Sequence, residues 1–407
     1  MNIKMDGKSA LDYFSTFSRA SLGMLGVWPE PTRKNENLSK FLFIITFTFT
    51  FLSAVLPQAI RLIQIWGNLD LISQILSTAE LPFTVALIKM IVLLYNKEKM
   101  SNLLLSFINN WNKTINCQHL NIMLKAGKSG RKISFLCIFM GLLTVHARIP
   151  QILFLNFDIW RRNDVDANFT LYIEAYFPYD WNYSPVFEIT CFIQYVGTFL
   201  ATVAYTGTDG FFSQIAYHLS GQYHILRLRL LDLVNKTENI KSWIEFDNQL
   251  NGIIQNHEHI NRCIQILEST FNFMFVVQLL ACSLQFCVQG YVLILYTTRE
   301  STKSVLFDVS FIVTYLIYQI GNFYIYCYLA EMLQSESLKF AQSAYNCQWY
   351  KLPPKKVKFL LFIMQRGRKP VAITAGKFCV LNLALFGRIL RTSLGYLSVL
   401  ITMNKRT

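Results

Sequence analysis

Residues 41–60 read FLFIITFTFTFLSAVLPQAI, twenty residues without a charged side chain that end at Arg61. A helix needs about 20 apolar residues to cross the roughly 30 Å of hydrocarbon in a bilayer. The stretch therefore predicts a transmembrane helix, and the other apolar runs can be measured against it. Three more runs carry no charge and are no shorter, at residues 189–208, 269–298 and 309–330.

Three further apolar runs carry charged side chains, and the one near the C-terminus is the least continuous. They are residues 69–95 with Asp70, Glu80 and Lys89, residues 132–157 with Arg148, and residues 372–403 with Lys377, Arg388 and Arg391. Together the seven runs predict an all-α membrane protein with seven transmembrane helices.

The composition agrees with a membrane protein. The chain has 407 residues, of which 53% are hydrophobic and 15% are charged, whereas soluble domains have about 25% charged residues. This leaves too little polar surface for several soluble domains, so we expect one polytopic membrane domain. The net charge of +14 comes from Lys and Arg beside the apolar runs, which is typical of loops next to anionic lipid and argues against a nucleic-acid partner.

The loops alternate in their content of Lys and Arg. Residues 1–40 hold six, 97–132 hold seven, 209–268 hold five and 331–377 hold nine, whereas residues 158–188 hold two. By the positive-inside rule the basic loops are cytoplasmic, so the N-terminus is inside and, after seven crossings, the C-terminus is outside. A G-protein-coupled receptor has the opposite orientation, so that class stays an alternative only if the orientation is misread. A secondary transporter, the other alternative, predicts an internal repeat, and none is visible.

The cytoplasmic segments have helical periodicity and are not tails. Residues 210–268 are expected to extend the fourth and fifth spans below the membrane, and residues 9–25 form an amphipathic stretch suited to the inner interface. The expected division is a cytoplasmic N-terminus at 1–40, spans one to six with a ligand pocket at 41–334, a cytoplasmic anchor helix at 335–370, and a seventh helix with a short extracellular tail at 371–407.

Motifs for catalysis, metals and cofactors are missing from the sequence. There is no phosphate-binding glycine loop and no nucleophile elbow, and His257-Glu-His259 has no third ligand at metal spacing. We therefore expect no enzyme, no cofactor and no metal. No signal peptide is visible in the first 20 residues, so the first span is expected to act as the targeting signal. Asn168-Phe-Thr170 is the one good glycosylation candidate, and an unmodified Asn168 is equally compatible.

The C-terminal third carries a family resemblance. Its elements are Ala344-Tyr-Asn-Cys-Gln-Trp-Tyr350, Phe359-Leu-Leu-Phe-Ile-Met-Gln-Arg366, Lys369-Pro-Val371, Thr374-Ala-Gly376 and Leu390-Arg-Thr-Ser393 with Tyr396. Over about 60 residues this pattern closely resembles the last two elements of insect odorant receptors. A Tyr-Phe-Pro element at 176–178 agrees with it, and residues 40–105 look similar in style to hymenopteran members.

The resemblance implies a ligand-gated cation channel in the plasma membrane of olfactory sensory neurons. Members of this family assemble as tetramers with a shared odorant coreceptor subunit and do not activate G proteins. The chain lacks the large insertion that the coreceptor carries in its second cytoplasmic loop, so the resemblance implies an odorant-tuning subunit. The expected ligand is a small, volatile and mostly apolar molecule.

Three groups of residues follow as candidate sites. The ligand pocket should lie in the outer half of the spans, and a tyrosine pair on the sixth span resembles one that lines pockets in this family. The pocket candidates are Phe83, Thr84, Thr144, Arg148, Gln151, Phe187, Cys191, Gln194, Tyr195, Tyr291, Phe311, Tyr315 and Tyr318. A stripe of aromatic side chains is more often plain helix packing than a ligand site, and that is the alternative for these residues.

The seventh helix is expected to line the pore. Aligning Tyr396 with the family places Val399, Thr402 and Met403 at a hydrophobic constriction that gates by excluding water. Contact with a neighbouring helix is the alternative for Val399 and Met403. Arg388 and Arg391 are expected to point away from the ion path, or else this subunit contributes little to the pore beside the coreceptor subunits.

The cytoplasmic end is expected to hold the subunits together. Tyr345, Trp349 and Tyr350 are large aromatic residues suited to an anchor interface between subunits, with packing inside one subunit as the alternative. In the membrane, Glu80 and Arg148 are expected to form a structural ion pair, or Arg148 meets the polar head of a ligand.

Overall fold

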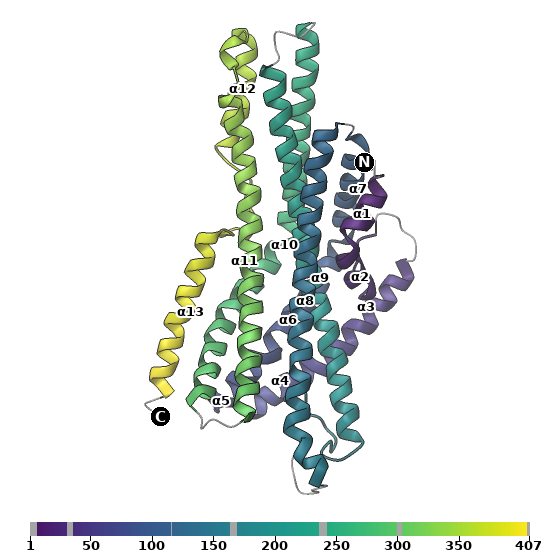
Figure 1. The fold of residues 1–407 in the computed structure, drawn as a ribbon, viewed down its shortest axis with the longest axis vertical. Coiled ribbons are helices and arrows are strands. Elements are labelled where there is room, and N and C mark those ends of the chain that lie inside the picture. The colour runs from purple at the N-terminus through teal and green to yellow at the C-terminus, as the bar shows by residue number, and fades with distance from the viewer. Residues whose placement is uncertain are drawn as a thin grey trace.

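The structure is a computed structural model that describes residues 6–30, 36–114, 116–162, 169–235, 242–298 and 303–404. Helices make up most of the described chain, and its only strands form one short hairpin, which confirms the predicted all-α fold. Four long helices run along the long axis of the molecule (Figure 1). They are α8 (Cys117–Arg162), α9 (Val186–Asn235), α10 (Trp243–Thr298) and α11 (Lys303–Asn346).

Six segments of the described chain are long and apolar enough to cross a membrane. They are Glu36–Gln64, Cys117–Phe157, Val186–Asn235, Trp243–Thr297, Val305–Asn346 and Leu383–Thr402. The 56 residues of α10 make a helix of about 84 Å at 1.5 Å per residue, more than twice the thickness of the hydrocarbon layer. The long helices therefore continue beyond the bilayer without a break, as the periodicity of residues 210–268 predicts.

The first two spans are built from shorter pieces. The first joins α3 (Glu36–Thr50), the π-helical turn η1 (Phe51–Val55) and α4 (Leu56–Gln64), and the second joins α5 (Leu69–Ile75), the π-helical turn η2 (Leu76–Glu80) and α6 (Leu81–Tyr95). A proline, Pro57 or Pro82, follows two residues after each π turn. Because proline has no N–H to donate and its ring crowds the preceding turn, that turn widens.

The last span begins later than its hydrophobicity predicts. Residues 374–380 form a hairpin of β1 (Thr374–Ala375) and β2 (Cys379–Val380), and α13 starts only at Leu383 and runs to Asn404. Gly376 and Lys377, with φ of 63° and 62°, make the turn, and two such consecutive residues are typical of a tight hairpin. The expected start at residue 372 is therefore wrong, and Lys377 lies in the hairpin rather than in the span.

The N-terminal segment packs into the helix bundle. It forms α1 (Gly7–Phe14) and α2 (Thr16–Met24), which lie beside α7 (Lys97–Lys113) and α9 (Figure 1). Phe14 is 1% exposed and stacks on Trp111 with ring centroids 5.5 Å apart. The amphipathic face of residues 9–25 is thus covered by protein, where the sequence suggested contact with the membrane interface.

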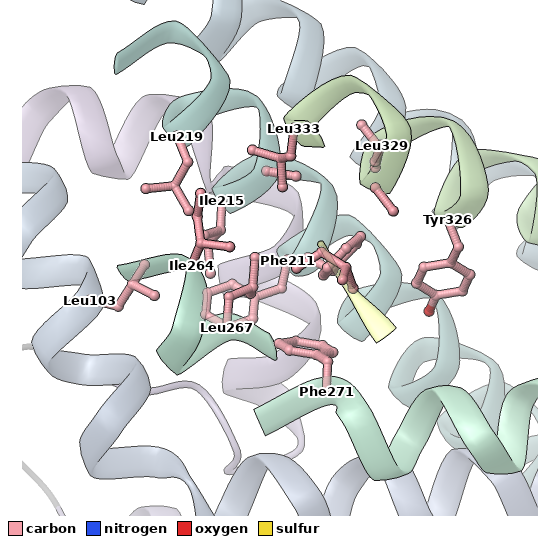
Figure 2. Packing of buried hydrophobic residues seen from close by; sticks show 14 of the residues in the cluster. Leu103, Phe211, Ile215, Leu219, Ile264, Leu267, Phe271, Tyr326, Leu329 and Leu333 are labelled. Carbon is pink, nitrogen blue, oxygen red and sulfur yellow. The ribbon is translucent and has the colours of Figure 1, made fainter. Parts of the chain in front are cut away.

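The core continues from the membrane spans into the extensions. Figure 2 shows side chains from four helices meeting there, spaced three or four residues apart along each helix. They are Leu103 from α7, Phe211, Ile215 and Leu219 from α9, Ile264, Leu267 and Phe271 from α10, and Tyr326, Leu329 and Leu333 from α11. At the far end of the extension, the 3-10 turn η4 (Trp349–Lys351) leads into α12 (Pro354–Gly367), which packs back along α11.

Candidate functional site

A cavity of about 130 Å³ lies among the helices that form the spans. It is lined by α5, α6, α8, α9, α10 and α11, together with the segment that precedes α9. Its lining residues are Gln74, Ile75, Pro82, Phe83, Thr144, Val145, Arg148, Tyr172, Ile173, Glu174, Thr198, Ala201, Thr202, Tyr205, Tyr296, Phe311, Tyr315, Tyr318 and Gln319.

Six of the predicted pocket residues line this cavity, namely Phe83, Thr144, Arg148, Phe311, Tyr315 and Tyr318. The three aromatic residues of α11 form a continuous stack. The rings of Phe311 and Tyr315 are 6.1 Å apart and nearly parallel, and those of Tyr315 and Tyr318 are 6.3 Å apart. Such a stack gives the cavity one flat, rigid, largely apolar wall.

Four predicted pocket residues on α9 lie outside the lining and support it. Gln194 is buried and holds both backbone groups of Ile173: its Oε1 accepts from the N–H at 3.1 Å, and its Nε2 donates to the C=O at 2.8 Å. Tyr195 packs edge-on against Tyr172. Phe187 stacks on Phe169, and Cys191 packs at the edge of the hydrophobic core.

The remaining three predicted pocket residues also lie outside the lining. Thr84 is exposed and donates to the C=O of Glu80 within its own helix. Tyr291 donates to Asp70 Oδ1 at 2.7 Å. Gln151 is buried beside the cavity, where it accepts from Arg148 at 2.5 Å and donates to Asp308.

Sequence reasoning missed the segment that closes the cavity. Tyr172, Ile173 and Glu174 precede α9 and line the cavity. Besides Gln194, the contacts that hold this segment include the Tyr172 hydroxyl, which donates to the C=O of Val145 at 2.7 Å. Burial raises the pKa of the Tyr172 phenol, so the hydroxyl keeps the proton that this bond uses. The apolar run 171–173 was the only sequence signal, and it was too short to interpret.

Arg148 does not pair with Glu80. Its Nε donates to the C=O of Tyr172 at 3.2 Å, and its guanidinium lies 5.5 Å from the centroid of the Phe311 ring. Among the described residues, the buried Oε2 of Glu80 has no hydrogen-bond partner. The expected structural ion pair is therefore wrong, because Arg148 is used to fix the segment that precedes α9.

A buried polar cluster lies next to the cavity, one to two helical turns toward the extensions. Lys89 of α6 and Asp209 of α9 form an ion pair at 2.5 Å, with side chains 0% and 1% exposed. Asn322 donates to the other oxygen of Asp209 at 2.6 Å, and Tyr326 also donates to Asp209. We call Lys89, Asp209, Asn322 and Tyr326 the polar cluster.

Two tyrosines of the cavity lining, Tyr205 and Tyr318, are in contact with the polar cluster. Lys89 Nζ lies 3.3 Å from the centroid of the Tyr205 ring, a close cation–π contact. Asn322 Nδ2 also reaches the Tyr318 hydroxyl at 3.5 Å. Since Tyr205 and Tyr318 both line the cavity, a ligand that moved these rings would act directly on the cluster.

The predicted pore residues lie on α13, at one edge of the molecule beside α10 and α11 (Figure 1). Ser393 donates to the C=O of Ser283 at 3.1 Å and ties α13 to α10. Val399 is 55% exposed on the free side, Thr402 is exposed and donates to the C=O of Ser398, and the side chain of Met403 lies outside the described part of the structure. Arg388 and Arg391 are exposed.

The predicted anchor residues lie at the far end of the extension. Tyr345 and Tyr350 are 65% and 68% exposed, and Trp349 is 38% exposed. On α12, Phe359, Leu361 and Phe362 are exposed as well. Asn168, the glycosylation candidate, lies outside the described residues.

The fold and the site thus define a multi-pass helical membrane protein with a cavity among its spans. A family model described as "7tm Odorant receptor" matches residues 72–394. The chain therefore belongs to the insect odorant receptor family, a family of receptors rather than of enzymes.

Relatives and solved structures agree with that assignment. The chain is 21% identical to odorant receptor 94a of Drosophila melanogaster, over 94% of this chain and 95% of that protein. It is 24% identical to the odorant receptor coreceptor of Harpegnathos saltator, over 40% of this chain and 31% of the coreceptor. The structure of the olfactory receptor OR5 from Machilis hrabei in complex with eugenol matches with a TM-score of 0.79 and 16% identity, over 98% of this chain and 100% of that one.

Proposed function

We propose that the chain is an odorant-tuning subunit of a ligand-gated cation channel that works as a heterotetramer with the odorant coreceptor. In this proposal a small volatile molecule occupies the cavity and biases the channel toward its open state. The subunit acts in the plasma membrane of olfactory sensory neurons, with its N-terminus in the cytosol and its C-terminus outside.

The observation that carries the proposal is the cavity itself. It is a hollow between the helices that is walled on one side by stacked aromatic rings, and its lining also carries polar side chains such as Arg148 and Gln319. Concave sites that combine apolar walls with placed polar groups are typical of small-molecule binding. Its volume of about 130 Å³ is close to that of a cavity that holds one benzene ring. Both size and chemistry suit a volatile ligand.

The packing of α13 supports a route from the cavity to a pore. α10 and α11 both contribute lining residues, and both pack against α13. Leu397 of α13 lies so close to Gly290 of α10 that a side chain at Gly290 would collide with it. A ligand that favours one packing of α10 and α11 would therefore displace α13, but only by as much as its affinities for the two states differ.

The exposed face of α13 supports its place beside an ion path. In the most apolar 18-residue stretch of α13, 11% is buried within the chain, compared with 61% in the corresponding stretch of α10. Val399 and Thr402, on the uncovered side, would form the hydrophobic constriction together with Met403. The exposed aromatic residues Tyr345, Trp349 and Tyr350 would pack against neighbouring subunits at the cytoplasmic anchor.

Recording of odorant-evoked currents tests the proposal. The chain is expressed together with the coreceptor and challenged with a panel of volatile molecules. We expect cation currents that need both subunits and persist when G-protein signalling is blocked. Currents that disappear with that block would favour a G-protein-coupled receptor, and uptake of a volatile without current would favour a transporter. Either result would contradict the proposal.

An epitope fused after Thr407 tests the orientation separately. We expect antibody to reach it in intact cells, whereas an epitope before Met1 should become accessible only after permeabilisation. The opposite pattern would overturn the proposed topology.

A further inference from the structure

One wall of the cavity carries a buried acceptor without a partner. Gln319 of α11 is 1% exposed and lines the cavity. Its Nε2 donates to the Tyr315 hydroxyl at 3.0 Å, but its Oε1 has no hydrogen-bond partner among the described residues. A buried carbonyl oxygen in that position costs free energy until a donor reaches it.

Tyr315 supplies the complementary group one turn away. Its hydroxyl oxygen accepts from Gln319 at 3.0 Å and from Gln285 at 3.4 Å. A phenol has one proton of its own to donate, and with two amide donors on the oxygen that proton is left for an acceptor in the cavity. Tyr315 and Gln319 therefore present one donor and one acceptor side by side.

The other charged groups of the lining are already engaged. Glu174 accepts from Arg61 at 3.1 Å, and Arg148 donates to the C=O of Tyr172 and to Gln151. Among the described lining residues, Gln319 is the one with a buried side-chain atom that lacks a hydrogen-bond partner, while Phe83 and Phe311 provide apolar contact.

We propose that the cavity selects small aromatic or cyclic molecules that carry a hydroxyl group. The ligand oxygen accepts the proton of Tyr315, and the ligand hydroxyl donates to Gln319 Oε1. An ether of the same shape can satisfy only Tyr315, and a hydrocarbon satisfies neither group. The inference rests on the proposed role of the cavity as the ligand site, and it adds the chemical class of the ligand.

Three probes that share one ring test the selectivity: phenol, anisole and toluene. Their binding to the purified full-length chain is measured by calorimetry. We expect phenol to bind about tenfold more tightly than anisole, which lacks the bond to Gln319, and anisole to bind more tightly than toluene, which lacks both bonds. A tenfold difference is about the effect of one hydrogen bond to a group that otherwise stays unpaired.

The variant Gln319→Met removes the acceptor and keeps the length of the side chain. We expect it to bring the affinities of phenol and anisole within about threefold of each other, because both can still accept from Tyr315, while toluene remains the weakest ligand. Gln289→Met is the matched control. Gln289 is 0% exposed, its Oε1 also lacks a partner among the described residues, and it is not among the residues that line the cavity. This control should keep the preference for phenol.

If Gln319→Met does not fold, Tyr315→Phe tests the other half of the pair, because it keeps the ring and loses only the hydroxyl. Anisole should then lose its advantage over toluene. Equal affinities in the wild-type chain, no binding of any probe, or an unchanged preference in the Gln319 or Tyr315 variant would each overturn the inference. The binding measurement needs no open channel. A preference for phenol without odorant-evoked current would contradict the proposed function alone, and currents without such a preference would contradict this inference alone.

Discussion

The cavity and the polar cluster next to it share three helices, α6, α9 and α11, and they differ in how their polar groups are satisfied. In the polar cluster, Asp209 receives donors from Lys89, Asn322 and Tyr326 in a site without exposed surface. In the cavity, Gln319 keeps an unpaired acceptor beside empty volume. The first arrangement fixes the distance between helices, and the second leaves a contact for a ligand to complete.

This difference separates two kinds of substitution. A change in the polar cluster should reduce the stability of the chain, because a buried charge without its partner has a large desolvation cost. A change in the cavity lining should alter which ligands act, because packing there is already incomplete.

The largest expected effect is that of Asp209→Ala. It leaves Lys89 buried and unpaired, so we expect a loss of about 3–5 kcal/mol in the free energy of unfolding. Thermal unfolding of the purified chain, with its folded yield, measures the change. The double variant Lys89→Met, Asp209→Leu should recover more than half of the loss, because no unpaired charge remains. An Asp209→Ala chain as stable as the wild type would show that the cluster does not hold the helices together.

A smaller effect on stability and a larger one on ligand choice are expected for Phe83→Leu. The variant enlarges the cavity and should favour a ligand one or two carbons larger by about tenfold in relative potency, at a cost of about 1 kcal/mol in stability. Odorant-evoked currents in cells that also express the coreceptor give the potencies.

Phe187→Leu is the matched control for Phe83→Leu. Phe187 is equally buried but stacks on Phe169 outside the cavity lining. It should lose similar stability and keep the wild-type order of ligand potencies. A change in ligand order in the Phe187 variant alone would favour the pocket predicted from sequence over the cavity seen in the structure.

Gln194→Leu tests the segment at residues 172–174, which closes one side of the cavity. It removes both hydrogen bonds to Ile173, so residues 172–174 should open more often and release ligand about fivefold faster, corresponding to about 1 kcal/mol. The rate at which current decays after odorant is washed out measures this. Arg61→Met, which breaks only the partly exposed ion pair with Glu174, should change the decay much less. Equal effects of the two variants would show that Gln194 does not hold the segment closed.

The spans could be predicted from sequence because length and hydrophobicity are local properties. The run at 41–60 lies within Glu36–Gln64, and the uncharged run at 269–298 forms the membrane part of α10. The start of the seventh span could not be predicted in the same way. There a turn at Gly376 and Lys377 overrides the apolar character of the segment.

The candidate site was only partly predictable for a related reason. The aromatic residues of α11 lie three or four positions apart, so their common face is visible in the sequence. The segment at 172–174 reaches the cavity through Gln194, about twenty positions further along, and Lys89 meets Asp209 across 120 positions. Such contacts depend on how the helices cross, which a single sequence without relatives does not reveal.

The central claim is that the cavity between α6, α8, α9 and α11 receives the ligand that opens the channel. The most direct test is an experimental structure of the chain assembled with the coreceptor and bound to an activating volatile molecule. The account predicts ligand density against Phe83, Tyr315 and Tyr318, with its polar atom near Gln319. Ligand density elsewhere, such as between α13 and a neighbouring subunit, with this cavity unfilled, would contradict it.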